Sequence, residues 1–109
     1  MSEKNRKQQL TELLIKLSEI TSAQSTRPNN QYLIDLLKKA TDKIAANQQN
    51  AITEARTVYQ NANTICLVNK ISLTSKEKAL LEKINQLAQS SGVLGGINAF
   101  NAVNTWPGN

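Results

Sequence analysis

The sequence contains no histidine among its 109 residues. Histidine is the commonest general base, the commonest protein ligand for transition metals and the side chain that ordinarily changes charge between about pH 5 and 8. Glycine-rich phosphate loops, Cys-x-x-Cys pairs and Glu-x-x-His carboxylate motifs are also missing from the chain. These absences argue against an enzyme, and we expect neither a cofactor nor a metal site.

Cysteine occurs once, as Cys66, so an internal disulfide is impossible. Cys66 falls in an apolar helical pattern, where a buried and inert thiol is expected, and this suits a reducing compartment. Long apolar runs are missing too, and the existing ones are far shorter than the ~20 residues needed to span a bilayer. No apolar run follows the basic residues at the N-terminus, so no secretory signal is predicted. We expect a cytoplasmic protein that is not integral to a membrane.

The charge is moderately basic, with 13 Lys and Arg against 8 Asp and Glu and a formal net charge of +5. This balance permits attraction to phosphate backbones or to anionic lipid. The basic residues are scattered over several segments, and the helix faces that carry them have mixed signs. Two alternative functions therefore remain open, a basic helical adaptor that binds nucleic acid and a peripheral module on an anionic membrane.

What the sequence does contain is helical periodicity. Apolar residues recur at the three- and four-residue spacings of an amphipathic helix in four segments, and no alternating strand pattern of useful length occurs. The spacing predicts helices at about 5–23, 31–46, 51–69 and 75–91. The residues expected to face the core are Leu10, Leu13, Leu14, Leu17 and Ile20; Leu33, Leu36, Leu37, Ala40 and Ile44; Ala51, Ile52, Ala55, Val58, Tyr59, Ala62, Ile65 and Cys66; and Leu80, Leu81, Ile84, Leu87 and Ala88.

Short polar segments mark the helix boundaries. Thr74 followed by Glu77 is a capping box that starts the last helix, and Gly92 is its predicted stop. Asn29 or Asn30 is expected to cap the second helix. Four helices joined by short links pack most simply as an antiparallel bundle. The fold class predicted is therefore all-α, a single domain over residues 1–109 with a C-terminal tail, residues 92–109, folded back on the bundle.

The tail has unusual chemistry, because no side chain from Ile84 to Asn109 carries a charge. Phe100 and Trp106 are its large aromatic residues, and we expect them to anchor it. Both packing of Trp106 on its own bundle and direct contact of Trp106 with a partner remain open. Near the link between the third and fourth helices, Lys70, Lys76 and Lys78 are available to contact the same partner. These five residues form the predicted partner-binding site.

Five stretches of the chain carry a resemblance to a known family. They are Gln31-Tyr32-Leu33-Ile34-Asp35-Leu36-Leu37, Val58-Tyr59-Gln60, Leu67-Val68-Asn69-Lys70, Ile84-Asn85-Gln86-Leu87-Ala88 and Asn104-Thr105-Trp106-Pro107. With these stretches the chain resembles the immunity proteins of bacteria that produce pediocin-like bacteriocins. The resemblance extends from about residue 31 onward, whereas the first thirty residues match only in basic, amphipathic character and residues 92–96 depart from the family pattern.

The resemblance implies both a fold and a function. It implies a cytosolic antiparallel four-helix bundle that protects the producing cell from its own pore-forming peptide. The implied partner is the mannose phosphotransferase permease with bacteriocin bound to it, while free bacteriocin is not the implied target. The C-terminal half is implied to discriminate among bacteriocins. We expect a monomer with at most peripheral contact with the inner face of the membrane, and no nucleic-acid partner.

Overall fold

The computed structural model describes residues 3–89, and this part of the chain is built from four α-helices without any strand. The helices are α1 (Glu3–Ser22), α2 (Asn30–Ala45), α3 (Ala51–Val68) and α4 (Ser75–Gln89). The all-α prediction is confirmed, and each described helix boundary lies within about two residues of the predicted one. The predicted tail, including Gly92, Phe100 and Trp106, lies outside the described residues.

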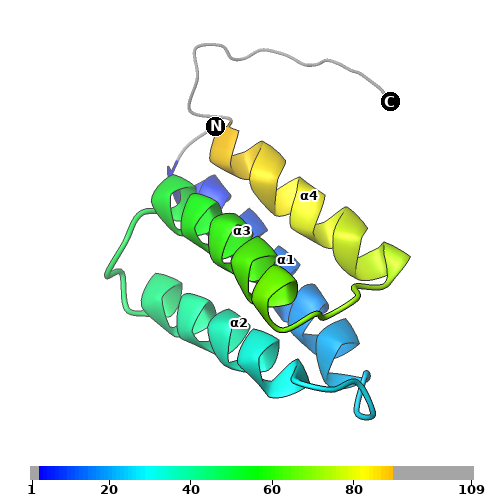
Figure 1. Cartoon of the computed structure of the whole chain (residues 1–109). Helices are drawn as coiled ribbons and strands as arrows, with labels where there is room; N and C mark the ends of the chain where they lie inside the picture. The colour runs from blue at the N-terminus through cyan, green and yellow to red at the C-terminus, as the bar shows by residue number, and fades with distance from the viewer. Residues whose placement is uncertain (1–2, 90–109) are drawn as a thin grey trace.

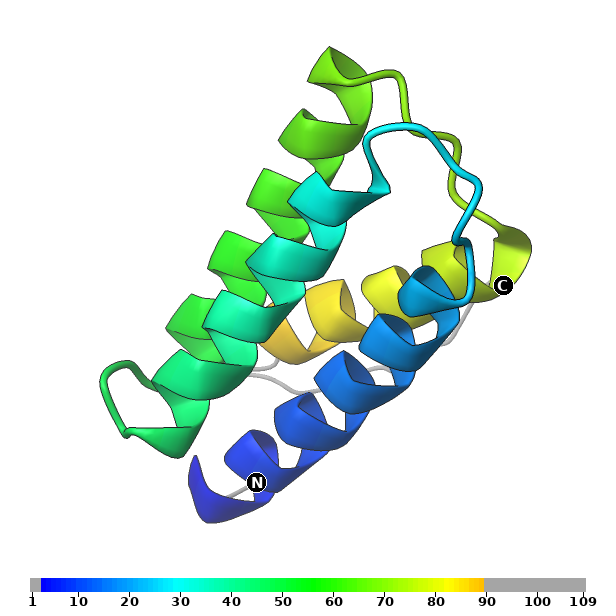
Figure 2. The same cartoon turned by 90° about the horizontal axis from the view of Figure 1, so that it is seen from below.

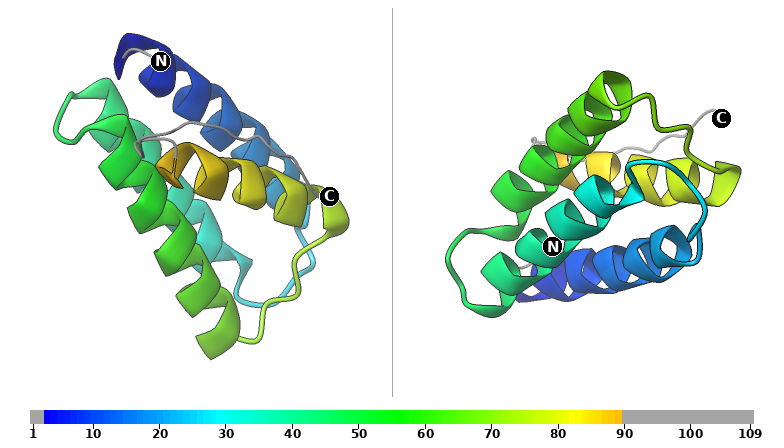
Figure 3. Two further views of the ribbon diagram at one scale, coloured as in Figure 1. Left: turned by 90° about the horizontal axis from the view of Figure 1, so that it is seen from above. Right: turned by 60° about the horizontal axis from the view of Figure 1, so that its bottom comes forward.

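Successive helices run in opposite directions, so the chain passes back and forth along the bundle (Figure 1). α1 packs against α2 and α4, α3 packs against the same two helices, and α1 and α3 also touch across the middle. The views in Figures 2 and 3 show that the C-terminal end of α3 extends beyond the start of α2. Among residues 3–89, no helix combines the length and apolarity that crossing a membrane requires.

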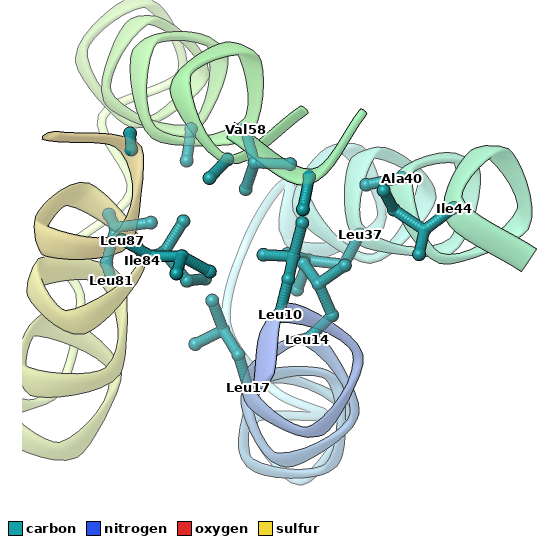
Figure 4. Close-up of a cluster of buried hydrophobic side chains, with 14 of the residues drawn as sticks. Leu10, Leu14, Leu17, Leu37, Ala40, Ile44, Val58, Leu81, Ile84 and Leu87 are labelled. Carbon is teal, nitrogen blue, oxygen red and sulfur yellow. The ribbon is translucent and has the colours of Figure 1, made fainter. Parts of the chain in front are cut away.

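The core lies between the four helices, whose apolar side chains converge there (Figure 4). Its fully buried residues come from all four predicted stripes: Leu10, Leu14, Leu17, Leu33, Leu37, Ala40, Ile44, Ala51, Ala55, Val58, Ala62, Leu81, Ile84, Leu87 and Ala88. Small alanines on α3 allow close approach of its neighbours, and the leucines of α1, α2 and α4 fill the remaining space. The 3.6-residue period therefore predicted the core well.

Individual residues depart from their predicted depth. Leu80 packs against the core but stays partly exposed, whereas Leu81 and Ile84 are 4% and 0% exposed. Tyr59 and Cys66 are likewise only partly buried at the edge of the core. The expected burial of Cys66 is thus only partial, because Cys66 lies in the last turn of α3, at the edge of the core.

The start of α2 also differs from its predicted form. Asn29 precedes α2 with φ of 62° and makes no side-chain capping bond. Its Nδ2 instead donates to the carbonyl oxygen of Asn69 at 3.2 Å. Asn30 is already the first residue of the helix, and its Nδ2 donates to the Thr21 carbonyl oxygen at 2.8 Å. Asn29 therefore occupies the predicted N-cap position, but its left-handed backbone differs from the extended conformation of a side-chain cap, and no side-chain capping bond forms.

Candidate partner-binding site

Lys70, Lys76 and Lys78, the three lysines of the predicted partner-binding site, lie in the described part of the chain. Lys70 is in the link after α3, and Lys76 and Lys78 are in the first turn of α4. All three side chains are exposed to solvent. Phe100 and Trp106, the two aromatic members, fall outside the described residues. The structure therefore places the three cations at the connection between α3 and α4 and leaves the two aromatic contacts as a prediction.

The backbone at Lys70 closes the end of α3 in a strained conformation. Lys70 has φ of 56°, in the left-handed region that normally favours glycine. The N–H of the next residue, Ile71, donates to the Cys66 carbonyl oxygen at 2.9 Å, which is the hydrogen bond of a Schellman motif. Ile71 is itself buried at 7% exposure. Ile71 thus holds the link on the core while the lysine side chain stays in solvent.

An open depression lies beside Lys76, where the end of α1 meets the start of α4. Its volume is about 570 Å³. The lining residues are Glu19, Ile20, Ala23, Gln24, Thr74, Ser75 and Lys76. The depression therefore brings the cation of Lys76 close to an apolar edge of α1 and to the polar start of α4.

Arg27, in the loop between α1 and α2, uses all five of its N–H donors. Nη1 donates to Glu77 Oε1 at 2.7 Å and to the Ser72 carbonyl oxygen at 3.1 Å. Nη2 donates to Glu77 Oε2 at 2.7 Å and to Asn30 Oδ1 at 2.7 Å, and Nε donates to the same Asn30 oxygen at 2.9 Å. The hydrogen bond to Glu77 is the main reason that the pKa of Arg27 is raised. Arg27 thus joins the α1–α2 loop to α2, to the α3–α4 link and to α4.

Glu77 is the anionic centre of the same cluster and is completely buried. Besides the two guanidinium bonds, Oε1 accepts the Thr74 N–H at 2.8 Å and Oε2 accepts the Thr21 hydroxyl at 2.7 Å. The Glu77 N–H donates back to Thr74 Oγ1 at 3.2 Å, so the predicted capping box is confirmed. Burial by itself raises the pKa of this carboxyl, but the hydrogen bonds from Arg27, Thr74 and Thr21 outweigh it and lower the pKa to about 2.

Thr21, Arg27 and Asn30 are members of this cluster that the sequence patterns did not predict. A signal was present in the helical spacing. Glu77 precedes Leu81 by four residues and Ile84 by seven, which places its carboxylate on the core-facing side of α4. A buried carboxylate needs hydrogen-bond donors, and a partly buried cation such as Arg27 can supply several of them. Thr21 follows Leu17 by four residues and faces the core for the same reason.

Two further titratable groups lie partly or wholly below the surface. Glu54 on α3 is 1% exposed, and Gln49 Nε2 donates to its Oε1. Burial raises the pKa of Glu54, opposed by the nearby charge of Lys43 and by the Gln49 bond. Burial is also the main reason that the pKa of the Cys66 thiol is raised. Within residues 3–89 no group of three or more His, Cys, Asp or Glu side chains could hold a metal ion.

These features describe a four-helix bundle with three exposed lysines at the connection between α3 and α4. Residues 5–89 match the family model of the bacteriocin immunity proteins, and the chain belongs to this family. A curated relative is the pediocin PA-1 immunity protein of Pediococcus acidilactici, which is 35% identical over 101 residues. The aligned region covers 93% of this chain and 90% of the relative.

Proposed function

We propose that this protein protects a bacteriocin-producing cell by binding, from the cytoplasmic side, the mannose phosphotransferase permease while a pediocin-like bacteriocin occupies it. The observation that carries the proposal is the 35% identity to a pediocin PA-1 immunity protein over nearly the whole chain. The permease is the receptor that the family resemblance implies. We further propose that the protein acts as a monomer and that part of its population is peripheral at the inner face of the membrane.

The proposed mode of action requires no covalent reaction. It requires only different affinities for the occupied and the empty permease. A protein that binds the occupied permease and the empty permease equally well shifts nothing between the two states. Moving a two-state equilibrium from about 1:99 to about 99:1 requires roughly a 10⁴-fold difference in affinity. The exposed cations Lys70, Lys76 and Lys78 are our proposed contacts with the occupied state. The cluster of Arg27 and Glu77 supports this role because it fixes the link and the first turn of α4 that carry the cations.

Protection in living cells tests the function directly. The gene is expressed in a bacteriocin-sensitive strain, which is then challenged with a panel of pediocin-like bacteriocins. Survival should rise against one bacteriocin or a small related group, and a strain without the mannose permease provides the control for receptor dependence. Unchanged sensitivity to every member of the panel would contradict the proposal. Specific DNA binding that survives physiological salt would favour the nucleic-acid alternative instead.

The proposed aromatic contacts need a separate test. Trp106→Ala and removal of residues 97–109 should leave the bundle helical by circular dichroism, because residues 3–89 of the four helices pack a continuous apolar core among themselves. Protection should be lost in both variants, since a buried tryptophan contributes roughly 150–250 Å² of contact area. Full protection by the shortened protein would show that Phe100 and Trp106 are not part of the site.

A further inference from the structure

The C-terminal turn of α3 exposes two apolar side chains, Leu67 and Val68, and the first turn of α2 exposes Tyr32. Leu67 is 82% exposed and Val68 is 71% exposed, although both belong to a helix whose earlier turns are packed. Tyr32 in the first turn of α2 is 56% exposed. The hydrogen bond between Asn29 and the Asn69 carbonyl oxygen holds the start of α2 beside the end of α3. The exposed surface at this end of the bundle therefore includes residues from two helices.

The charged residue nearest to Leu67 and Val68 in the chain is Lys70, whereas Asp35 is an exposed carboxylate one turn after Tyr32 on α2. From Ala55 to Lys76 the chain contains no Asp or Glu, whereas Arg56, Lys70 and Lys76 are basic. The carboxylate that follows, Glu77, is buried and already paired with Arg27. Lys70, two residues after Val68, is exposed. A partner that carries negative charge at its surface is therefore complementary to Lys70 beside Leu67 and Val68.

The shape of the surface favours a partner that is broad and deformable. The end of α3 projects beyond the start of α2, so Leu67 and Val68 lie on a protrusion (Figure 2). Three side chains supply far less than the roughly 800 Å² per subunit that a stable protein dimer buries. A bilayer interface accepts such a protrusion without a preformed pocket. Apolar side chains enter the acyl boundary, a tyrosine stays at the headgroup level, and a lysine reaches the phosphates.

We propose that the end of α3 is a membrane-contact point, at which Leu67 and Val68 enter the interface of an anionic bilayer and Lys70 binds lipid phosphate. Tyr32 lies at the headgroup level. The inference rests on the proposed location at the inner face of the membrane and specifies the side of the bundle that faces it. In this orientation α3 meets the bilayer with its C-terminal end, and the link carrying Lys70 lies next to the headgroups.

The test is binding of the full chain to lipid vesicles by sedimentation. Vesicles of equal parts phosphatidylglycerol and phosphatidylcholine should bind the protein, and pure phosphatidylcholine vesicles should bind it more weakly. Replacing both residues, Leu67→Gln and Val68→Gln, should weaken binding at least tenfold, because each apolar side chain that fails to enter the interface loses its transfer energy. Lys70→Gln should weaken binding roughly fivefold on the anionic vesicles alone.

The matched control is Ile15→Gln. Ile15 is 46% exposed and lies in the middle of α1, away from the proposed contact point. Its replacement should leave vesicle binding unchanged, and circular dichroism should show that every variant remains helical. Absence of vesicle binding, or binding that tolerates the double replacement, would overturn the proposal. A dimer that the same replacement dissociates would show that a second copy occupies the surface, and this too would overturn it.

The membrane contact can be distinguished experimentally from coverage by the C-terminal segment and from the proposed immunity function. Binding that occurs only after removal of residues 90–109 would mean that the chain's own C-terminal segment covers the surface, and would refute the membrane contact in the intact protein. The vesicles contain neither bacteriocin nor permease. Failure of vesicle binding therefore leaves the proposed immunity function intact, and failure of the survival assay leaves the vesicle result intact.

Discussion

Arg27 and Glu77 lie 50 positions apart in the chain and meet through two parallel hydrogen bonds, Nη1 to Oε1 and Nη2 to Oε2, each 2.7 Å long. The side chain of Glu77 is 0% exposed and that of Arg27 is 11% exposed. Removing one partner leaves the other charge buried and unpaired, which typically costs about 3–5 kcal/mol. The pair thus fixes where the α1–α2 loop and the α3–α4 link lie relative to each other.

The first prediction concerns the stability that this pair contributes. Arg27→Ala and Glu77→Gln should each lower the free energy of unfolding by about 3–5 kcal/mol, measured by urea denaturation. Lys76→Ala, one residue from Glu77 but exposed, should change it by less than about 0.5 kcal/mol. Equal, small effects of all three replacements would show that the pair does not hold the loops together.

The second prediction is the pH dependence of that contribution. The pKa of Glu77 falls from 4.5 to about 2 on folding, so the unfolded state takes up a proton first as the pH decreases. The stabilisation is present above about pH 5 and is lost as the pH falls toward 2, by an amount on the order of 3 kcal/mol. Urea titrations at pH 7, 5 and 3 should show this loss in the wild type. Glu77→Gln should lose less stability over the same pH range. An identical dependence of the unfolding free energy on pH in both proteins would contradict the role of Glu77.

The third prediction concerns Glu54, whose contribution to stability should change with pH in the direction opposite to that of Glu77. Burial raises its pKa, so the folded state holds the proton more tightly than the unfolded chain does. The ionised carboxylate therefore costs stability at neutral pH, and the cost disappears as the pH decreases below the unfolded pKa. Glu54→Gln should raise the urea midpoint at pH 7 and lose this advantage at low pH. Glu12→Gln, on the exposed side of α1, provides the control and should change the urea midpoint at pH 7 only slightly.

The helical stripes were predictable because burial of one side of a helix imposes a period of 3.6 residues on the sequence itself. Leu10, Leu14 and Ile84 are clear examples, since all three are fully buried. The capping box of Thr74 and Glu77 was predictable because its two residues lie only three positions apart in the chain. The second role of Glu77 was not read from the sequence, because its partner Arg27 lies in a polar loop whose path depends on how α1 and α2 pack.

The start of α2 shows the same limit. Asparagine is a common helix-capping residue, and the sequence around Asn29 does not indicate a different partner for its side chain. In the folded chain its Nδ2 donates to the carbonyl oxygen of Asn69, 40 positions away. Lys70 is a related case, because no rule of composition places a lysine in a left-handed conformation. Long-range partners thus decide the details of the loops, while local periodicity decides the helices.

The fourth prediction uses that conformation to separate stability from function at Lys70. Glycine has no side-chain clash at φ of 56°, so Lys70→Gly should stabilise the protein by about 0.5–1 kcal/mol. It should also reduce protection of a sensitive strain, because the charge is lost. Lys70→Gln is the matched control, since it removes the charge and keeps the strained backbone. A variant with glycine that is more stable and still fully protective would exclude Lys70 from the partner-binding site.

The central claim is that this protein distinguishes the bacteriocin-occupied permease from the empty one. The most direct measurement immobilises the protein and captures detergent-solubilised mannose phosphotransferase permease with and without saturating cognate bacteriocin. Our proposal predicts at least a hundredfold tighter capture in the presence of bacteriocin, and weaker capture by a variant in which Lys70, Lys76 and Lys78 are replaced by glutamine. Equal capture in both conditions would contradict it, because equal affinity for two states shifts neither of them.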